Sequence, residues 1–240
     1  MTFVKVVSAQ RLLWAITLAG LIGCANQLDE PHPEAATTET VVAEKVAEPS
    51  QVPAILPPGP ITQNPYLTTP APAVTAQART GFARAEQQMR QQRWGDARHT
   101  LQALVAESPN LSGPWLNLGI VWLHLDKPGQ ARAAFERALA ANSLNVDAYN
   151  QLAALERRAG NFAQADSLYN QALMVWPHSA DTHCNLGMLY DLYLGRWPDA
   201  LAHYEACGYL REQSTGAPDN TVKGWIIDLQ RRIAAREANG

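Results

Sequence analysis

Apolar and small residues recur with a period of 34 residues along the second half of the chain. In each period a large residue is followed three and four positions later by leucine and a small residue. About 16 positions after the large residue, a second group begins with alanine and continues with an aromatic residue at i+4 and a small residue at i+7. Each group occupies one face of a helix, because these spacings match 3.6 residues per turn. The pattern predicts pairs of amphipathic helices that approach closely at their small residues. The positions are Trp115, Leu118, Gly119, Ala131, Phe135 and Ala138, then Tyr149, Leu152, Ala153, Ala165, Tyr169 and Ala172, then His183, Leu186, Gly187, Ala200, Tyr204 and Cys207.

The period divides residues 78–214 into four units, which are 78–111, 112–145, 146–179 and 180–214. The first unit is degenerate, because Gly81 stands where the large residue belongs, although the neighbouring Phe82 can substitute for it. The fourth unit contains a one-residue insertion between Gly195 and Pro198. Glycine and proline separate the two helices of the second, third and fourth units, as expected for tight turns.

This pattern resembles the tetratricopeptide repeat, whose signature is W-x₂-L-G-x₂-Y…A-x₃-F…P. The resemblance implies an all-α fold, a right-handed α-solenoid of helix-turn-helix repeats. Such an array needs a cap on its terminal apolar face. Residues 215–240 supply a helix from about Thr221 to Glu237 with one apolar stripe, which favours a capping helix; a partner-binding helix is the alternative. The stripe consists of Val222, Trp225, Ile226, Leu229 and Ile233.

The N-terminus has the pattern of a targeting segment. Two bases, Lys5 and Arg11, precede an apolar run at residues 12–23, which is too short for a comfortable membrane span. The run ends in Leu21-Ile22-Gly23-Cys24, which resembles the lipobox of bacterial lipoproteins. The resemblance implies that residues 1–23 are a cleaved signal peptide and that Cys24 carries fatty acyl chains such as palmitate. Ala25 in place of aspartate implies sorting to the outer membrane, facing the periplasm; an uncleaved anchor is the alternative.

Residues 24–77 are expected to be a disordered linker. Ten of the 16 prolines lie between Pro31 and Pro72, where they interrupt helix and sheet alike. Six acids and one base between Ala25 and Gln77 make this segment acidic. A proline-rich recognition segment is the alternative.

The resemblance also implies a partner-binding groove, because the first helix of each repeat lines the concave surface in this family. Asn117, Gln151 and Asn185 share one repeat position and could hydrogen-bond the backbone of an extended peptide. Arg157 and Arg158 could bind a carboxylate, or could be a solvated basic helix end. The full set of predicted groove residues is Phe82, Met89, Leu116, Asn117, Ile120, Leu123, His124, Asn150, Gln151, Arg157, Arg158, Cys184, Asn185, Met188 and Asp191.

Two cysteines remain in the fourth unit. Cys207 lies at a packing position and Cys184 is expected to face the groove, so their directions diverge and disfavour a disulfide, although the periplasm is oxidising. A zinc site with His183 and His203 is disfavoured as well, because His183 takes a core position.

A protein-binding scaffold is the function that these features favour. The formal net charge of −3 argues against a nucleic-acid binder, and no motif typical of catalysis or of cofactor binding stands out. The expected partners are periplasmic or membrane proteins, in the assembly of a pilus, secretion or motility machine. The alternative is regulation of a peptidoglycan synthase or hydrolase, and self-association stays open.

Overall fold

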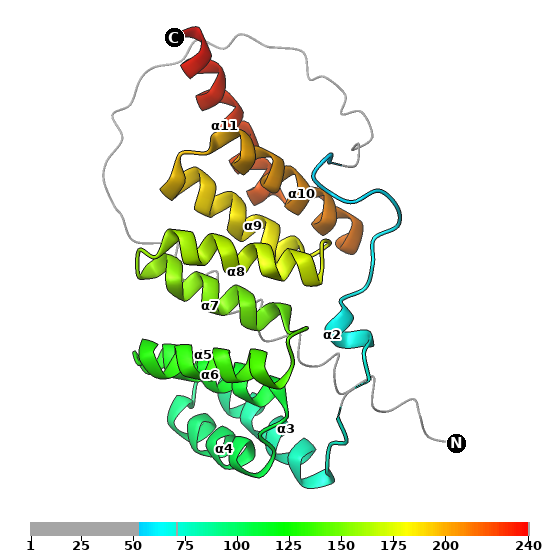
Figure 1. Cartoon of the computed structure of the whole chain (residues 1–240), viewed down its shortest axis with the longest axis vertical. Coiled ribbons are helices and arrows are strands. Elements are labelled where there is room, and N and C mark those ends of the chain that lie inside the picture. The colour runs from blue at the N-terminus through cyan, green and yellow to red at the C-terminus, as the bar shows by residue number, and fades with distance from the viewer. Residues whose placement is uncertain (1–52, 71, 240) are drawn as a thin grey trace. The chain divides into compact units, whose positions relative to one another are not determined.

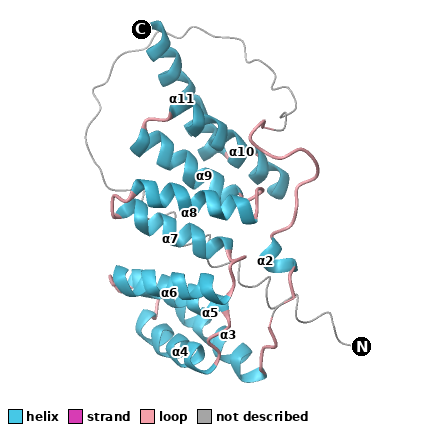
Figure 2. Cartoon of the chain, in the orientation of Figure 1, coloured by secondary structure: helices cyan, strands magenta, loops and turns pink. Residues whose placement is uncertain are grey.

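The computed structural model describes residues 53–70 and 72–239 (Figure 1). The described residues all belong to one compact unit, residues 52–240, and every structural statement below concerns this unit. The predicted signal peptide, Cys24 and the linker up to residue 52 lie outside the described residues. In the described part the secondary structure is helical, without strands (Figure 2). The helices are α2 (Pro65–Thr68), α3 (Ala76–Arg90), α4 (Trp94–Glu107), α5 (Ser112–His124), α6 (Pro128–Ala141), α7 (Val146–Arg158), α8 (Phe162–Val175), α9 (Ala180–Leu189), η3 (Tyr190–Leu194), α10 (Trp197–Thr215) and α11 (Asn220–Ala238).

Four helical hairpins stack in chain order, as the 34-residue period predicts. In each hairpin a first helix, here called helix A (α3, α5, α7, α9), packs against a helix B (α4, α6, α8, α10), and each helix B packs against the next helix A. Helix α11 packs on α10 at the end of the stack. The predicted α-solenoid with a C-terminal capping helix is therefore the observed fold.

Glycine sets the distance between the two helices of the second and fourth hairpins. A Cβ atom on Gly119 would lie 2.3 Å from the ring of Phe135, and one on Gly187 would lie 2.5 Å from the ring of Tyr204. Both distances are below van der Waals contact, so the fully buried ring of Phe135 and the buried ring of Tyr204 lie directly against helix backbone. The small residue of the repeat pattern thus has a direct steric cause.

Each turn from helix A to helix B uses one residue in the left-handed conformation. These residues are Gln92, Asp126, Gly160 and Gly195. In the first three hairpins the next residue donates its amide to a carbonyl five positions back: Arg93 to Gln88, Lys127 to Trp122, Asn161 to Glu156. In the fourth, Arg196 donates to Tyr190, six positions back, and the helix ends in the π-helical turn η3. The predicted insertion is therefore absorbed as one wider turn.

The linkers that lead into α7, α9 and α11 are built differently, around polar side chains that cap the next helix, whereas α5 begins after Leu111 without a side-chain cap. Asn145 is 1 % exposed and accepts from the amide of Ala148, while its side-chain NH₂ donates to Ser112. Ser112 in turn donates to the carbonyl of Ala138. Ser179 accepts from the amide of Thr182 in the same way. These bonds satisfy helix-end groups that water would otherwise have to reach.

The end of the predicted linker is not free. Residues 53–70 and 72–75, here called the strap, run past the linkers between hairpins (Figure 1). Leu56 is 6 % exposed and packs against Ala206 and Leu210 of α10. Trp176 donates its indole N–H to the carbonyl of Thr62, whose own amide donates to Nδ1 of His178. The prediction of a disordered linker over residues 24–77 is thereby corrected for its last part, because a proline-rich segment that forms no more than the four-residue helix α2 can still bury isolated apolar side chains.

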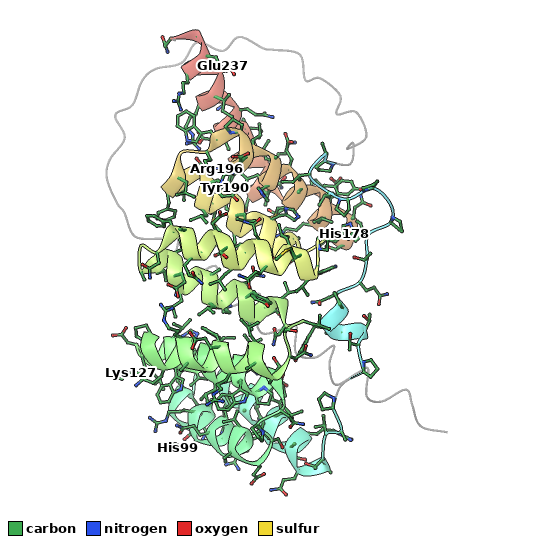
Figure 3. All side chains as sticks on the ribbon, in the orientation of Figure 1. His99, Lys127, His178, Tyr190, Arg196 and Glu237 are labelled. Atoms are coloured by element: carbon green, nitrogen blue, oxygen red, sulfur yellow. A yellow bond between two sulfur atoms is a disulfide. The ribbon has the colours of Figure 1, made fainter. Side chains whose placement is uncertain are left out.

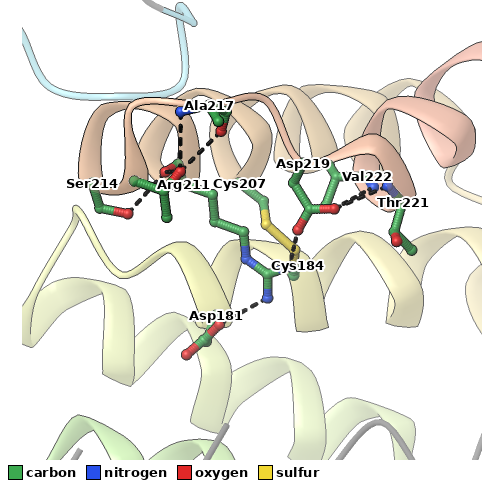
Figure 4. A network of polar contacts seen from close by, with 10 residues as sticks. Asp181, Cys184, Cys207, Arg211, Ser214, Ala217, Asp219, Thr221 and Val222 are labelled. Atoms are coloured by element: carbon green, nitrogen blue, oxygen red, sulfur yellow. Dashed lines mark hydrogen bonds and ion pairs between the residues drawn. A yellow bond between two sulfur atoms is a disulfide. The ribbon is translucent and has the colours of Figure 1, made fainter. Parts of the chain in front are cut away.

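The capping helix is held by an arginine that bridges three helices (Figure 4). Arg211 of α10 donates to Asp181 of α9 at 3.0 Å and to Asp219, the N-cap of α11, at 2.6 Å. Asp219 also accepts from the amides of Thr221 and Val222. Val222 and Leu229 of the apolar stripe of α11 are fully buried where α11 packs on α10.

Candidate protein-binding surface

Five of the predicted groove residues are too buried to contact a partner. Met89 and Cys184 are 3 % exposed, Leu116 is 7 % exposed, and Asn117 and Asn150 are each 8 % exposed. Met89 and Leu116 belong to the two main apolar cores. The prediction is corrected here, because these positions, which the resemblance assigned to an open surface, lie in the packing between helices; Met89 contacts the core of α4 and α5, and Cys184 is bonded to Cys207 of α10.

A second set of predicted groove residues is half-buried, and several of its members make contacts within the protein. It consists of Phe82, Ile120, Leu123, Gln151, Arg157, Asn185, Met188 and Asp191. Ile120, Leu123 and Met188 pack against the core. Asp191 forms an ion pair with Arg232 of the capping helix, at 2.8 Å. Within the described residues, no side-chain hydrogen bond joins Asn117, Gln151 and Asn185, so the row of amides at one repeat position is not a continuous ladder.

Cys184 does not face a groove. It forms a disulfide with Cys207, with 5.3 Å between the two Cα atoms. Gly187 and Tyr204, which bring α9 and α10 into close contact, each lie three residues from a cysteine. The small residue at position 187 was therefore the signal in the sequence that could have favoured the disulfide over diverging directions.

Two histidines next to the disulfide, His183 and His203, are joined by a hydrogen bond. His183 is 2 % exposed, as its core position predicted, and its Nε2–H donates to the carbonyl of Pro177. Its Nδ1 is then an acceptor, which receives the Nδ1–H of His203 at 2.9 Å. Burial lowers the pKa of both rings, that of His203 to about 3, so both are neutral at pH 7.

The accessible residues of the predicted groove are His124 and Arg158, and both lie in the last turn of a helix A. With Arg90 and Leu192 they form a row at 34-residue spacing, each member exposed. We call the side of the stack that holds the four A-to-B turns the turn edge (residues 90–94, 124–128, 158–162 and 192–197). The opposite side, with the four B-to-A linkers, is the loop edge (residues 108–112, 142–146, 176–180 and 216–220). Lys127 and Arg196 mark the turn edge, and His178 the loop edge (Figure 3).

Aromatic rings link the first turn to the second, and the third turn to the fourth, along the turn edge. Trp94, the first residue of α4, stacks on His124 of the next repeat with 3.7 Å between ring centroids. Phe162, the first residue of α8, packs against Tyr193 of the next repeat at 5.0 Å. The guanidinium of Arg157 lies 5.7 Å from the ring centroid of Tyr193, a cation–π distance. The turn edge is thus a supported surface rather than a set of separate loops.

Sequence reasoning missed the apolar part of this edge. Leu192, Tyr193 and Leu194 form most of the π-helical turn and are 64 %, 47 % and 37 % exposed. Three consecutive exposed large apolar residues are unusual on a protein surface. The insertion that causes the wider turn was visible in the sequence, but its effect on exposure was not.

Two carboxyl groups elsewhere on the A helices are poorly solvated. Burial raises the pKa of Glu86 to about 7, against a smaller opposing effect of Arg90, and Oε1 of Glu86 has no hydrogen-bond partner. Burial, together with the charge of Asp181, raises the pKa of Asp147 to about 6. Neither group forms part of the turn edge. In the described residues, no helix combines the length and the apolar character needed to cross a membrane.

Comparisons with known proteins agree with the repeat period. The tetratricopeptide repeat family matches residues 82–145 and, through a second description of the same repeat, residues 144–207. A segment of 77 residues is 36 % identical to tetratricopeptide repeat protein 8 of Homo sapiens, and covers 32 % of this chain but 14 % of that protein.

Solved structures show the same fold at low sequence identity. PilF of Pseudomonas aeruginosa superposes with a TM-score of 0.59 at 16 % identity, over 66 % of this chain and 70 % of that one. MamA gives a TM-score of 0.52 at 20 % identity, over 58 % of this chain and 81 % of that one. The two family matches together span residues 82–207, more than half of the sequence, and the stacked hairpins follow the same period. This chain belongs to the tetratricopeptide repeat family.

Proposed function

We propose that this protein is a lipid-anchored scaffold of the bacterial periplasm, which binds protein partners through its repeats and aids assembly of an envelope machine. Repeat arrays of this kind present long surfaces to other proteins. The arrangement of this array supports a binding role, because its loop edge is closed by helix caps and by the strap while its turn edge is left open.

The observation that carries the cellular location is the disulfide between Cys184 and Cys207. Both cysteines are 3 % exposed or less. Structural disulfides form and persist in oxidising compartments, and the periplasm is one of them. The disulfide therefore supports the same compartment that Leu21-Ile22-Gly23-Cys24 predicts independently.

Lipidation is tested by replacing Cys24 with alanine in the full-length chain. We expect Cys24→Ala to abolish incorporation of a labelled fatty acid and to release the protein from membranes washed with alkaline carbonate. The matched control is the double variant Cys184→Ala/Cys207→Ala, which should be labelled as the wild type is. Unchanged labelling and processing of Cys24→Ala would show that the lipobox interpretation is wrong.

The kind of machine is tested by photo-crosslinking in living cells. A photoreactive amino acid at the exposed position His124 should capture envelope proteins that the same residue at Met174, 77 % exposed on α8, does not. Subunits of a pilus, secretion or motility system among the captured proteins would support the assembly role. Peptidoglycan synthases or hydrolases would instead support regulation of cell-wall enzymes.

A further inference from the structure

The turn edge has an apolar end that is fixed in position. Leu192, Tyr193 and Leu194 project from a turn that is closed by the Arg196 to Tyr190 hydrogen bond and supported by Phe162. Arg196 stacks 4.1 Å from the ring centroid of Tyr190 and also pairs with Asp199, which holds the other side of the turn. The exposed side chains are therefore presented on a rigid support, which lowers the entropic cost of binding.

The turn edge carries a net positive charge once the side chains that form ion pairs within the protein are set aside. The six bases on or beside the four turns are Arg90, Arg93, Lys127, Arg157, Arg158 and Arg196, and the five acids are Asp96, Asp126, Glu156, Asp191 and Asp199. Four of the acids are engaged within the protein, Asp96 with Arg93, Glu156 with Arg132, Asp191 with Arg232 and Asp199 with Arg196. Arg90 and Arg158 are exposed and make no ion pair in the described part of the chain. His124 lies between these two arginines in the row. Partial burial lowers the pKa of its ring, so the ring is neutral at pH 7.

We propose that the turn edge binds an acidic, extended protein segment, with its carboxylates on Arg158 and Arg90 and one large apolar side chain on the Leu192–Leu194 turn. This inference specifies the kind of protein segment that the scaffold binds, and it rests on the protein-binding function proposed above. Arginine pairs well with carboxylates, because its planar guanidinium donates two parallel hydrogen bonds. Arginine, tyrosine and large apolar residues are also the types that dominate binding energy at interfaces.

The spacing of the row favours an extended segment over a flat lipid surface. Neighbouring helices pack roughly 8–10 Å apart, and an extended chain advances about 3.3 Å per residue, so one repeat corresponds to about three residues. A carboxylate on Arg158 thus predicts an apolar residue about three positions away, on the next repeat. A lipid surface would require apolar residues at several turns, whereas the second turn carries Asp126, Lys127 and Pro128.

The test is selection from a displayed library of random 12-residue peptides on the full-length chain, purified in mild detergent and immobilised by a C-terminal tag. We expect selected peptides to be enriched in aspartate and glutamate, with leucine, phenylalanine or tyrosine about three positions from an acid. Binding of the selected peptides should weaken about tenfold or more with Arg158→Glu, because the substitution replaces attraction for a carboxylate with repulsion. Leu192→Ser should weaken it as well.

Two substitutions on other faces are matched controls. Arg137→Glu reverses an exposed charge on α6, and Met174→Ser removes an exposed apolar side chain from α8. Both should leave peptide affinity within about twofold, as expected for positions that make no contact with the ligand.

Three results would overturn the proposal. They are the absence of any selected peptide, selected peptides without an excess of acids, and peptides whose affinity the two turn-edge variants leave unchanged. Co-sedimentation with vesicles of phosphatidylglycerol that falls with the same two variants, in the absence of selected peptides, would assign the edge to lipid. Partners captured by crosslinking in cells after such a failure would leave the scaffold function standing and reject the acidic segment alone.

Discussion

The two edges of the helical stack each contain four connections between helices, but the connections are capped and covered at one edge and exposed at the other. At the loop edge, Asn145, Ser179 and Asp219 cap the helices that follow, and the strap covers the linkers with Leu56 and Thr62. At the turn edge, helices α4, α6, α8 and α10 begin without a side-chain cap, and Leu192 is 64 % exposed. One edge is closed by the chain itself and the other is open.

This difference separates stability from recognition. Buried hydrogen bonds and covered apolar side chains stabilise the folded state, so substitutions at the loop edge should lower the free energy of unfolding. Exposed side chains contribute little to folding, so substitutions at the turn edge should be nearly neutral for stability and costly for binding. The following variants test that separation.

The largest effect is expected from the disulfide, which ties α9 to α10 below the loop edge. The two cysteines are 23 residues apart, and a loop of this length corresponds to a loss of about 3 kcal/mol when the bond is absent. We expect Cys184→Ala/Cys207→Ala to lower the free energy of unfolding in urea by that amount. Reduced wild-type protein should fall to nearly the same value, whereas equal stability of the oxidised wild type and the variant would contradict the structure.

Asn145→Ala should come next. It removes the cap of α7 and leaves the hydroxyl of Ser112 without its buried donor. Loss of a cap costs about 1 kcal/mol, and loss of the hydrogen bond to Ser112, whose hydroxyl still donates to the carbonyl of Ala138, costs about 1 kcal/mol more, so we expect about 2 kcal/mol in all. Asn170→Ala, on the exposed face of α8, is the control and should change stability by less than about 0.5 kcal/mol.

Leu56→Ala tests whether the strap belongs to the folded unit. Leu56 is 6 % exposed, but it is held by a segment that can move to fill the space, so we expect a loss of about 1–2 kcal/mol, below the usual range for a central leucine. The neighbouring Ile55, 40 % exposed, provides the control Ile55→Ala. Equal effects of the two substitutions in urea unfolding would mean that the strap does not pack in solution.

Acid should release the strap before it unfolds the repeats. Nδ1 of His178 accepts from the amide of Thr62, so it must be unprotonated, and burial lowers the pKa of this ring below its usual 6.5. A lowered pKa means that this contribution to stability is complete above pH 6.5 and declines as the pH falls toward the folded pKa. We expect the hydrogen-exchange protection of the Thr62 amide, corrected for intrinsic rates, to decline over that range. Protection of the Leu152 amide, in the core of α7, should persist there, and a parallel loss of both would contradict local release.

The 34-residue period predicted most of the fold, because each repeat reflects how its own two helices pack against each other. Gly119 and Gly187 marked the close approach of helices, and the insertion before Pro198 marked the wider turn. The strap could not be predicted in this way, because Leu56 and Thr62 lie in a proline-rich segment without a period and acquire their contacts from distant repeats. The groove was predicted too broadly for the same reason. Whether Leu116 or Arg158 is exposed depends on how neighbouring repeats pack, which the spacing within one repeat does not state.

The smallest effects on stability are expected at the turn edge, and they complete the comparison. Leu192→Ser and Arg158→Glu alter side chains that are exposed and make no hydrogen bond or ion pair in the described residues, so each should change the free energy of unfolding by less than about 0.5 kcal/mol. The measurement is urea unfolding beside Asn145→Ala under identical conditions. A loss of 2 kcal/mol or more at Leu192 would mean that the turn is part of the folded core, and any binding defect of that variant would then reflect unfolding rather than lost contact. If the free energy of unfolding is unchanged, a loss of peptide affinity in these variants can be attributed to lost contacts, because substitutions at the turn edge then leave the folded structure at the loop edge intact.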